Sequence, residues 1–136
     1  MRKTGADDWK QRMTTLRSLV LLGEQAVPAL TKALDSPHSP TRVLAAQALS
    51  YLGPQADLAR LTTTVKTDRP AAARLYAVDA IGTSGQSASV DWEQLASQER
   101  NRDVRKHINH ARLRGDEPIS TAVISTLKQW APATID

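Results

Sequence analysis

The chain has 136 residues and a formal net charge of +4, which is enough for one domain with a core of its own. It contains no Cys, so a disulfide framework, a thiolate metal site and a cysteine nucleophile are excluded. It also contains no Phe, three Trp and two Tyr, so its core must consist mainly of Leu, Val, Ile and Ala, a composition that favours an all-α domain over a β-sandwich or barrel.

Neither a signal peptide nor a membrane span is expected. The first basic residues lead into Ala6-Asp7-Asp8-Trp9 rather than an apolar leader. No apolar run approaches the roughly 18 residues that a membrane-spanning helix needs. The cytoplasm is therefore the default compartment, and no membrane partner is expected. The sequence pI of about 9.8 permits nucleic acid or an acidic partner but requires neither.

The first predicted hairpin covers the N-terminal quarter of the chain. We expect a helix that Asp7 or Asp8 caps and whose apolar residues recur at helical spacing up to Gly23. A second helix is expected over 26–34, with Pro28 in its first turn.

The next predicted hairpins are the most regular. Ser39 and Pro40 predict the start of a helix, with Ser39 as its N-cap, and Gly53 predicts its end. The apolar residues of this helix recur at i, i+3, i+4 and i+7, namely Ala45, Ala48, Leu49 and Leu52. A partner helix over 58–65 and a further helix over 70–82 follow.

The C-terminal copy of the pattern is weaker. We expect a short helix over 90–96, a helix over 101–114 that Gly115 ends, and a last helix from 118 to about 130. We treat 6–130 as one repeat domain and 131–136 as a tail, which could be a linker to a further domain.

Four arginines recur at a nearly constant interval. Arg12 precedes Arg42 by 30 residues, Arg42 precedes Arg74 by 32, and Arg105 follows 31 residues later. A helical hairpin repeated at this period cannot bury its apolar face alone, but stacked copies form a continuous core. The spacing predicts an all-α solenoid of about seven helices in three to four hairpin repeats. The alternative is an irregular helical bundle.

Two segments resemble the short, lyase-like HEAT repeats of bacteria, an armadillo-type α-solenoid family. Residues 24–37 resemble the first helix of such a repeat, and 41–49 resemble the second, with its Arg followed by an Ala-rich run. The resemblance covers roughly 12–115 and departs from the pattern at Gln11, Thr41 and Arg112. It implies an all-α, right-handed α-α superhelix. It does not select a function, because relatives include plain scaffolds, phycobilin lyases, DNA glycosylases and a di-iron hydroxylase.

The resemblance implies a structural role for the repeated arginines. The ladder comprises Arg12, Arg42, Arg74 and Arg105. Each guanidinium is expected to lie near a turn between repeats and to pair with a neighbouring acid. The candidate acids are Asp8, Asp35, Asp68 and Asp103. A ligand-binding ladder is the alternative.

A second candidate surface is basic and lies near the C-terminal end. The candidate binding face comprises Arg102, Arg105, Lys106, His110, Arg112 and Arg114. Phosphates or an acidic protein could bind there, and a solvated helix face is the alternative. His107 and His110 have the spacing of a shared metal site, but no metal and no cofactor are expected.

No catalytic set is apparent in the sequence. Trp9, Trp92 and Trp130 are expected in the core or at end caps, and Asp79 stands alone on an Ala-rich helix. We therefore expect a monomeric, non-catalytic scaffold that binds a protein or another domain of its own chain. The alternatives are a nucleic-acid-binding, DNA-glycosylase-like protein that uses the basic face, and a bilin-lyase-like enzyme.

Overall fold

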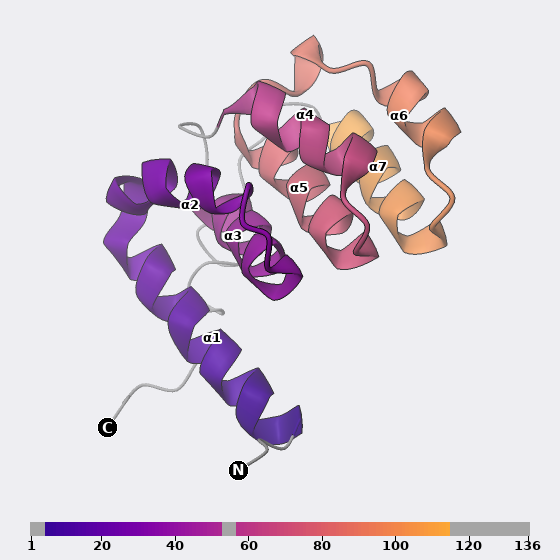
Figure 1. Ribbon diagram of the computed structural model, residues 1–136. Helices are drawn as coiled ribbons and strands as arrows, with labels where there is room; N and C mark the ends of the chain where they lie inside the picture. The colour runs from indigo at the N-terminus through magenta and orange to yellow at the C-terminus, as the bar shows by residue number, and fades with distance from the viewer. Residues whose placement is uncertain (1–4, 53–56, 115–136) are drawn as a thin grey trace.

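The structure is a computed structural model that describes residues 5–52 and 57–114, with the side chains of 10–52 and 57–113. Within these residues the chain is helical (Figure 1). The α-helices are α1 (Gly5–Leu22), α2 (Val27–Ala33), α3 (Ser39–Leu52), α4 (Leu58–Thr67), α5 (Ala71–Thr83), α6 (Trp92–Gln98) and α7 (Arg102–Arg114). Two 3₁₀-helices, η1 (Gly23–Ala26) and η2 (Ser87–Ser89), join neighbouring α-helices. The helix expected from 118 and the tail 131–136 lie outside the described residues.

The helices form two layers. The inner helices α1, α3, α5 and α7 follow one another, with α3 packed along α5 and α5 along α7. The outer helices α2, α4 and α6 pack against α3, α5 and α7, respectively (Figure 1). This arrangement confirms the predicted all-α solenoid of stacked hairpins.

Capping side chains fix where several helices begin. Asp57 accepts a hydrogen bond from the Arg60 N–H at 3.3 Å at the start of α4, and Asp91 accepts one from Gln94 N–H at 3.1 Å at the start of α6. Asn101 Oδ1 accepts from the N–H groups of the second and third residues of α7 at 2.9 and 3.1 Å. Each cap satisfies N–H groups that a helix start leaves without a partner.

Two of the predicted helix starts are wrong. Helix α1 already begins at Gly5, so neither Asp7 nor Asp8 is its cap. Helix α3 begins at Ser39, and the His38 carbonyl accepts its first hydrogen bonds, so His38 rather than Ser39 precedes the helix. The turn after α5 contains Gly85, which adopts φ 77°, a conformation that residues with a Cβ rarely adopt.

Small and branched apolar side chains fill the core between the layers. Ala48 on α3 and Ala80 on α5 are fully buried, as are Leu49 and Ile81 one residue further along. Ala at these positions lets neighbouring inner helices approach closely. Thr83 Oγ1 also donates to the Ser50 carbonyl of α3 at 2.8 Å and so joins the two helices.

No helix in the described part of the chain is long and apolar enough to cross a membrane.

Candidate functional site

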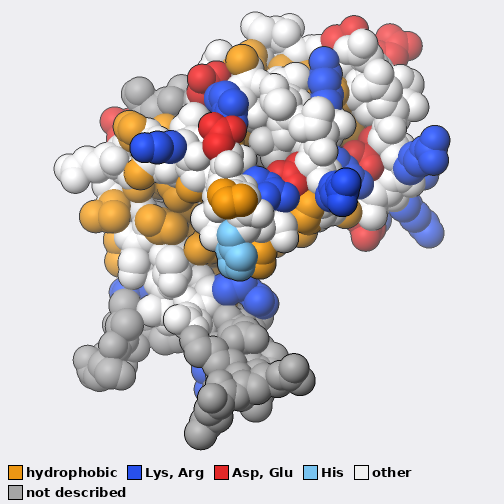
Figure 2. Space-filling view, in the orientation of Figure 1, with side chains coloured by type: hydrophobic (Ala, Val, Ile, Leu, Met, Phe, Trp, Pro, Cys, Tyr) orange, Lys and Arg blue, Asp and Glu red, His pale blue; other side chains and the backbone are white. Residues whose placement is uncertain are grey.

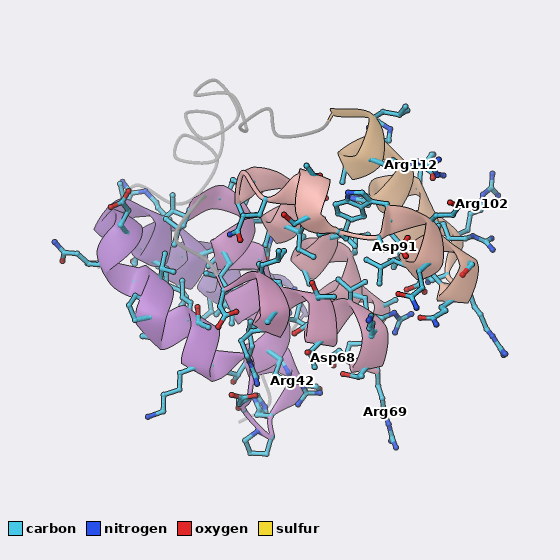
Figure 3. All side chains as sticks on the ribbon, turned by 90° about the horizontal axis from the view of Figure 1, so that it is seen from above. Arg42, Asp68, Arg69, Asp91, Arg102 and Arg112 are labelled. Atoms are coloured by element: carbon cyan, nitrogen blue, oxygen red, sulfur yellow. The ribbon has the colours of Figure 1, made fainter. Side chains whose placement is uncertain are left out.

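The turn between α2 and α3 holds the first of two arginine clamps. Arg42 Nε and Nη2 donate to Asp68 Oδ2 and Oδ1 at 3.0 and 3.1 Å, and Nη1 donates to the Ser36 carbonyl at 2.8 Å. Figure 3 shows Arg42 and Asp68 pointing toward each other at the ends of their helices. The Asp68 side chain is only 6% exposed. The hydrogen bonds from Arg42 to Asp68 raise the pKa of Arg42.

The second clamp repeats this geometry one hairpin later. Arg74 Nε and Nη2 donate to Glu99 Oε2 and Oε1 at 3.0 and 3.1 Å, and Nη1 donates to the carbonyls of Asp68 and Arg69, both at 2.8 Å. Asp68 therefore contacts Arg42 through its carboxylate and Arg74 through its carbonyl. The result is a continuous network along the turns on one edge of the stack, linking three successive hairpins.

The acid in the second clamp, Glu99, is missing from the predicted set. Asp68 stands six residues before Arg74, and Glu99 stands six residues before Arg105, so both acids occupy the same position in the repeat. Ser36 holds this position before Arg42 and has no carboxylate. The repeat spacing thus contains the signal that identifies Glu99.

The other two arginines of the predicted ladder are placed differently. Arg12 and Arg105 are exposed, and neither has a paired carboxylate among the described side chains. Asp35 pairs with Arg60 of α4 instead, and Asp103 lies exposed in the first turn of α7. The structure therefore forms two clamps of the kind expected, at Arg42 and Arg74. The side chain of Asp8 lies outside the described part.

The predicted basic face lies at the end of the stack. The exposed side chains of this set are Arg102, Arg105, Lys106, His110 and Arg112, and the side chain of Arg114 is outside the described part. In Figure 2, Lys and Arg side chains project where α6 and α7 lie, and Figure 3 shows Arg102 and Arg112 on α7. Arg112 and the 87% exposed Leu113 occupy the repeat positions of Ile81 and Gly82, which are buried in α5. Arg112 and Leu113 thus lie at positions that are buried in α5 but exposed on α7, the last helix that the structure describes.

A different set of polar side chains lies on the inner face, which we define by Arg17, Gln47, Tyr51, Tyr76, Asp79 and His107. Helix α5 has α3 and α7 beside it and α4 behind it, so its partly exposed Tyr76 and Asp79 lie on the side turned away from the outer helices. Gln47 and Arg17 occupy the same repeat position as Asp79, five residues after the repeated Arg. All members are partly exposed.

One hydrogen bond crosses the inner face between repeats. His107 Nδ1 of α7 lies 2.8 Å from Asp79 Oδ1 of α5, with side chains 38% and 31% exposed. His107 stands two residues after Arg105, and Tyr76 stands two residues after Arg74, so the two side chains occupy equivalent positions. Between α5 and α7, the side chain five residues after the repeated Arg therefore contacts the one two residues after the next Arg.

Both tyrosines of the chain lie near each other on this face. Burial raises the pKa of Tyr51, and the neighbouring Tyr76 and Asp79 raise it further. Burial and Asp79 also raise the pKa of Tyr76, whereas the positive charge of Arg12 lowers it. Both phenols are thus neutral hydrogen-bonding groups at physiological pH.

The other residues considered for chemistry do not assemble into a metal site. His107 pairs with Asp79, and the described residues contain no group of three metal-ligating side chains. Trp92 is 8% exposed and its Nε1 donates to the Ser87 carbonyl at 2.9 Å, so its ring lies in the core. The side chains of Trp9 and Trp130 lie outside the described part.

The second clamp predicts a specific pH dependence. Burial raises the pKa of Glu99, but hydrogen bonds from Arg74 and the Asn101 N–H outweigh it, so the net pKa lies below the ordinary 4.5. Because the folded-state pKa is the lower one, this stabilisation is complete above about pH 5 and is lost as the pH falls through the folded-state value. Glu99→Gln should therefore be less stable than the wild type at pH 7, and the difference should shrink as the pH falls below about 4.5.

Urea denaturation at a series of pH values measures this difference. Glu93→Gln is the matched control, because Glu93 is exposed in the first turn of α6. A stability difference for Glu99→Gln that stays constant down to about pH 3 would contradict the assignment.

The repeat pattern agrees with a comparison against known families. A family model of HEAT repeats matches residues 3–82, which is 80 of the 136 residues and extends from α1 to near the end of α5. No curated protein and no solved structure matches the chain significantly. With two stacked layers of helical hairpins and a match over more than half of its length, the chain belongs to the HEAT-repeat family.

Proposed function

We propose that the chain is a non-catalytic protein-interaction module that binds its partner on the inner face. HEAT repeats are commonly protein-interaction scaffolds. The described residues also form a continuous layer of inner helices, and no other described helix covers its inner side. The partner is a separate protein or another domain of the same chain.

The observation that carries this proposal is the position of the two tyrosines. The chain has only two, and they lie on neighbouring inner helices, partly exposed and close enough for Tyr76 to raise the pKa of Tyr51. Tyr presents a large, rigid surface with a hydroxyl group at its tip, and Tyr and Arg are enriched among the residues that dominate binding energy. The inner face combines these residue types, whereas the outer helix α4 exposes mainly Thr and Lys.

A photoreactive cross-linking residue tests the choice of face. We expect p-benzoylphenylalanine at Gln47, on the inner face, to form covalent protein adducts in an extract of the source cells. The same residue at the exposed Thr63 of α4 is the control and should form few adducts. Equal adduct yields at the two positions, or adducts with nucleic acid alone, would contradict the proposal.

A further inference from the structure

The inner face has an uneven distribution of charge. Near α1 it carries Arg12 and Arg17, and Lys10 lies two turns before Arg17 on the same side of the helix. Neither α1 nor α3 has a carboxylate among its described side chains, and those of Asp7 and Asp8 on α1 lie outside the described part. The carboxylates of the inner face stand on α5 and α7, where Asp79 is paired with His107 and Asp103 is exposed. The described side chains of the half formed by α1 and α3 are therefore cationic, and this half includes Tyr51 and borders Tyr76.

The charge of Arg12 on α1 acts on one of the tyrosines across α3. Arg12 lies close enough to Tyr76 of α5 for its charge to lower the pKa of that phenol, although α3 lies between the two helices. Arg12, Tyr51 and Tyr76 therefore come from three successive inner helices and border one region of the surface. A ligand lying across α3 can contact all three.

Arg17 lacks an acceptor for one of its nitrogens. Its Nε is buried and has no hydrogen-bond partner among the described residues, although the side chain as a whole is partly exposed. A buried N–H without an acceptor is unfavourable, so rotation toward an incoming carboxylate would relieve this cost. Guanidinium groups bind carboxylates with two parallel hydrogen bonds, as Arg42 and Arg74 do elsewhere in this chain.

From this arrangement we infer that the half of the inner face formed by α1, α3 and α5 binds an acidic peptide segment of the partner protein. Carboxylates of the segment pair with Arg12 and Arg17, and an apolar side chain between them packs on Tyr51 and Tyr76. This inference rests on the proposed function and adds the chemistry of the partner. Asp79 and Asp103 border the site and repel acidic residues, so they limit how far the segment extends toward α7.

Fluorescence anisotropy with three labelled peptides tests this inference. The probe is a fluorescein-labelled repeat of Glu-Glu-Leu, and the matched peptides carry Gln or Lys in place of Glu. At low salt we expect the Glu peptide to bind the full chain at least about tenfold more tightly than the Gln peptide, and added salt should weaken it. The Lys peptide should not bind.

Variants that each lack one positive charge test where the Glu peptide binds. Arg12→Gln and Arg17→Gln should each weaken binding of the Glu peptide about fivefold to tenfold. Arg69→Gln is the matched control and should leave binding unchanged, because Arg69 extends into solvent from the turn before α5 (Figure 3). All three side chains are at the surface, and a melting curve of each variant verifies that it is folded.

The possible outcomes separate this inference from the proposed function. Three outcomes would contradict an acidic partner: the Glu and Gln peptides bind equally well, Arg69→Gln weakens binding as much as the other two substitutions, or the Glu peptide does not bind. Tighter binding of a single-stranded DNA oligonucleotide, lost in the Arg12 and Arg17 variants, assigns the face to nucleic acid and also overturns it. If protein cross-links form at Gln47 while the peptides show no preference for Glu, only the acidic specificity fails.

Discussion

Replacement of Arg74 by Ala is expected to lower the free energy of unfolding by about 3 kcal/mol and the melting temperature by roughly 10 °C. Arg74 holds the Glu99 carboxylate with two hydrogen bonds and two turn carbonyls with two more. The Glu99 side chain is only 5% exposed, so the substitution leaves a buried carboxylate without its cation. Removing one partner of such a pair costs far more than removing an exposed charge.

Arg105→Ala is the matched control for this experiment. Arg105 occupies the same position of the repeat, but its side chain is exposed and has no paired acid among the described residues. We expect the free energy of unfolding of the Arg105→Ala variant to stay within about 0.5 kcal/mol of the wild-type value. Differential scanning calorimetry of both variants measures the contrast, and equal melting temperatures for Arg74→Ala and the wild type would contradict a structural role for the clamp.

Replacement of Ile81 by Ala is expected to destabilise the chain by about 3–4 kcal/mol. Ile81 is fully buried in α5, the helix that packs against both α3 and α7. Loss of three carbon atoms there removes apolar contacts and leaves a cavity that the tightly packed layers fill only in part. Urea denaturation should show a lower midpoint concentration of urea, whereas the slope of the unfolding free energy against urea concentration should stay the same.

Leu113→Ala serves as the control for Ile81→Ala. Leu113 is 87% exposed on α7, so its truncation removes a comparable apolar side chain without opening a cavity. We expect a change within about 0.5 kcal/mol. Equal destabilisation by the two substitutions would contradict the position of α5 as the centre of the stack.

The sequence predicts the helical layers well because their signal is local. Helical spacing of apolar residues within each segment identifies α3 and α5, and the interval from Arg42 to Arg74 shows that the two helices are copies. Copies of one hairpin must stack in the same way, so the layer arrangement follows from the repeat. The exact helix starts are less predictable, as at Gly5 and His38, because several residues near each start can supply the cap.

The polar contacts between repeats are harder to predict because their partners are far apart in the chain. Arg74 and Glu99 are 25 residues apart, and Asp79 and His107 are 28 apart. Spacing within one helix indicates neither pair. The first pair becomes visible once the repeats are aligned, because Glu99 matches Asp68, which binds the preceding Arg42. Each copy of the repeat can hold a different residue at these positions. Ser36, for example, stands where the later copies have the acids Asp68 and Glu99.

The basic residues of α7 illustrate a different limit of the sequence. Their helical spacing suggests a binding stripe on one helix, but it does not tell where that helix lies in the stack. In the structure, Arg112 stands at a position that Ile81 holds in the buried part of α5. The tyrosines, in contrast, stand apart in the sequence and come together only when α3 and α5 pack.

The cross-linking comparison between Gln47 and Thr63 tests the central claim most directly, when it is made with a competitor and with nuclease treatment. The account predicts protein adducts at Gln47 that persist after nuclease treatment, fall when excess Glu-Glu-Leu peptide is added, and are scarce at Thr63. Adducts that form equally well at Thr63, or that disappear with nuclease, would contradict a protein-binding role for the inner face.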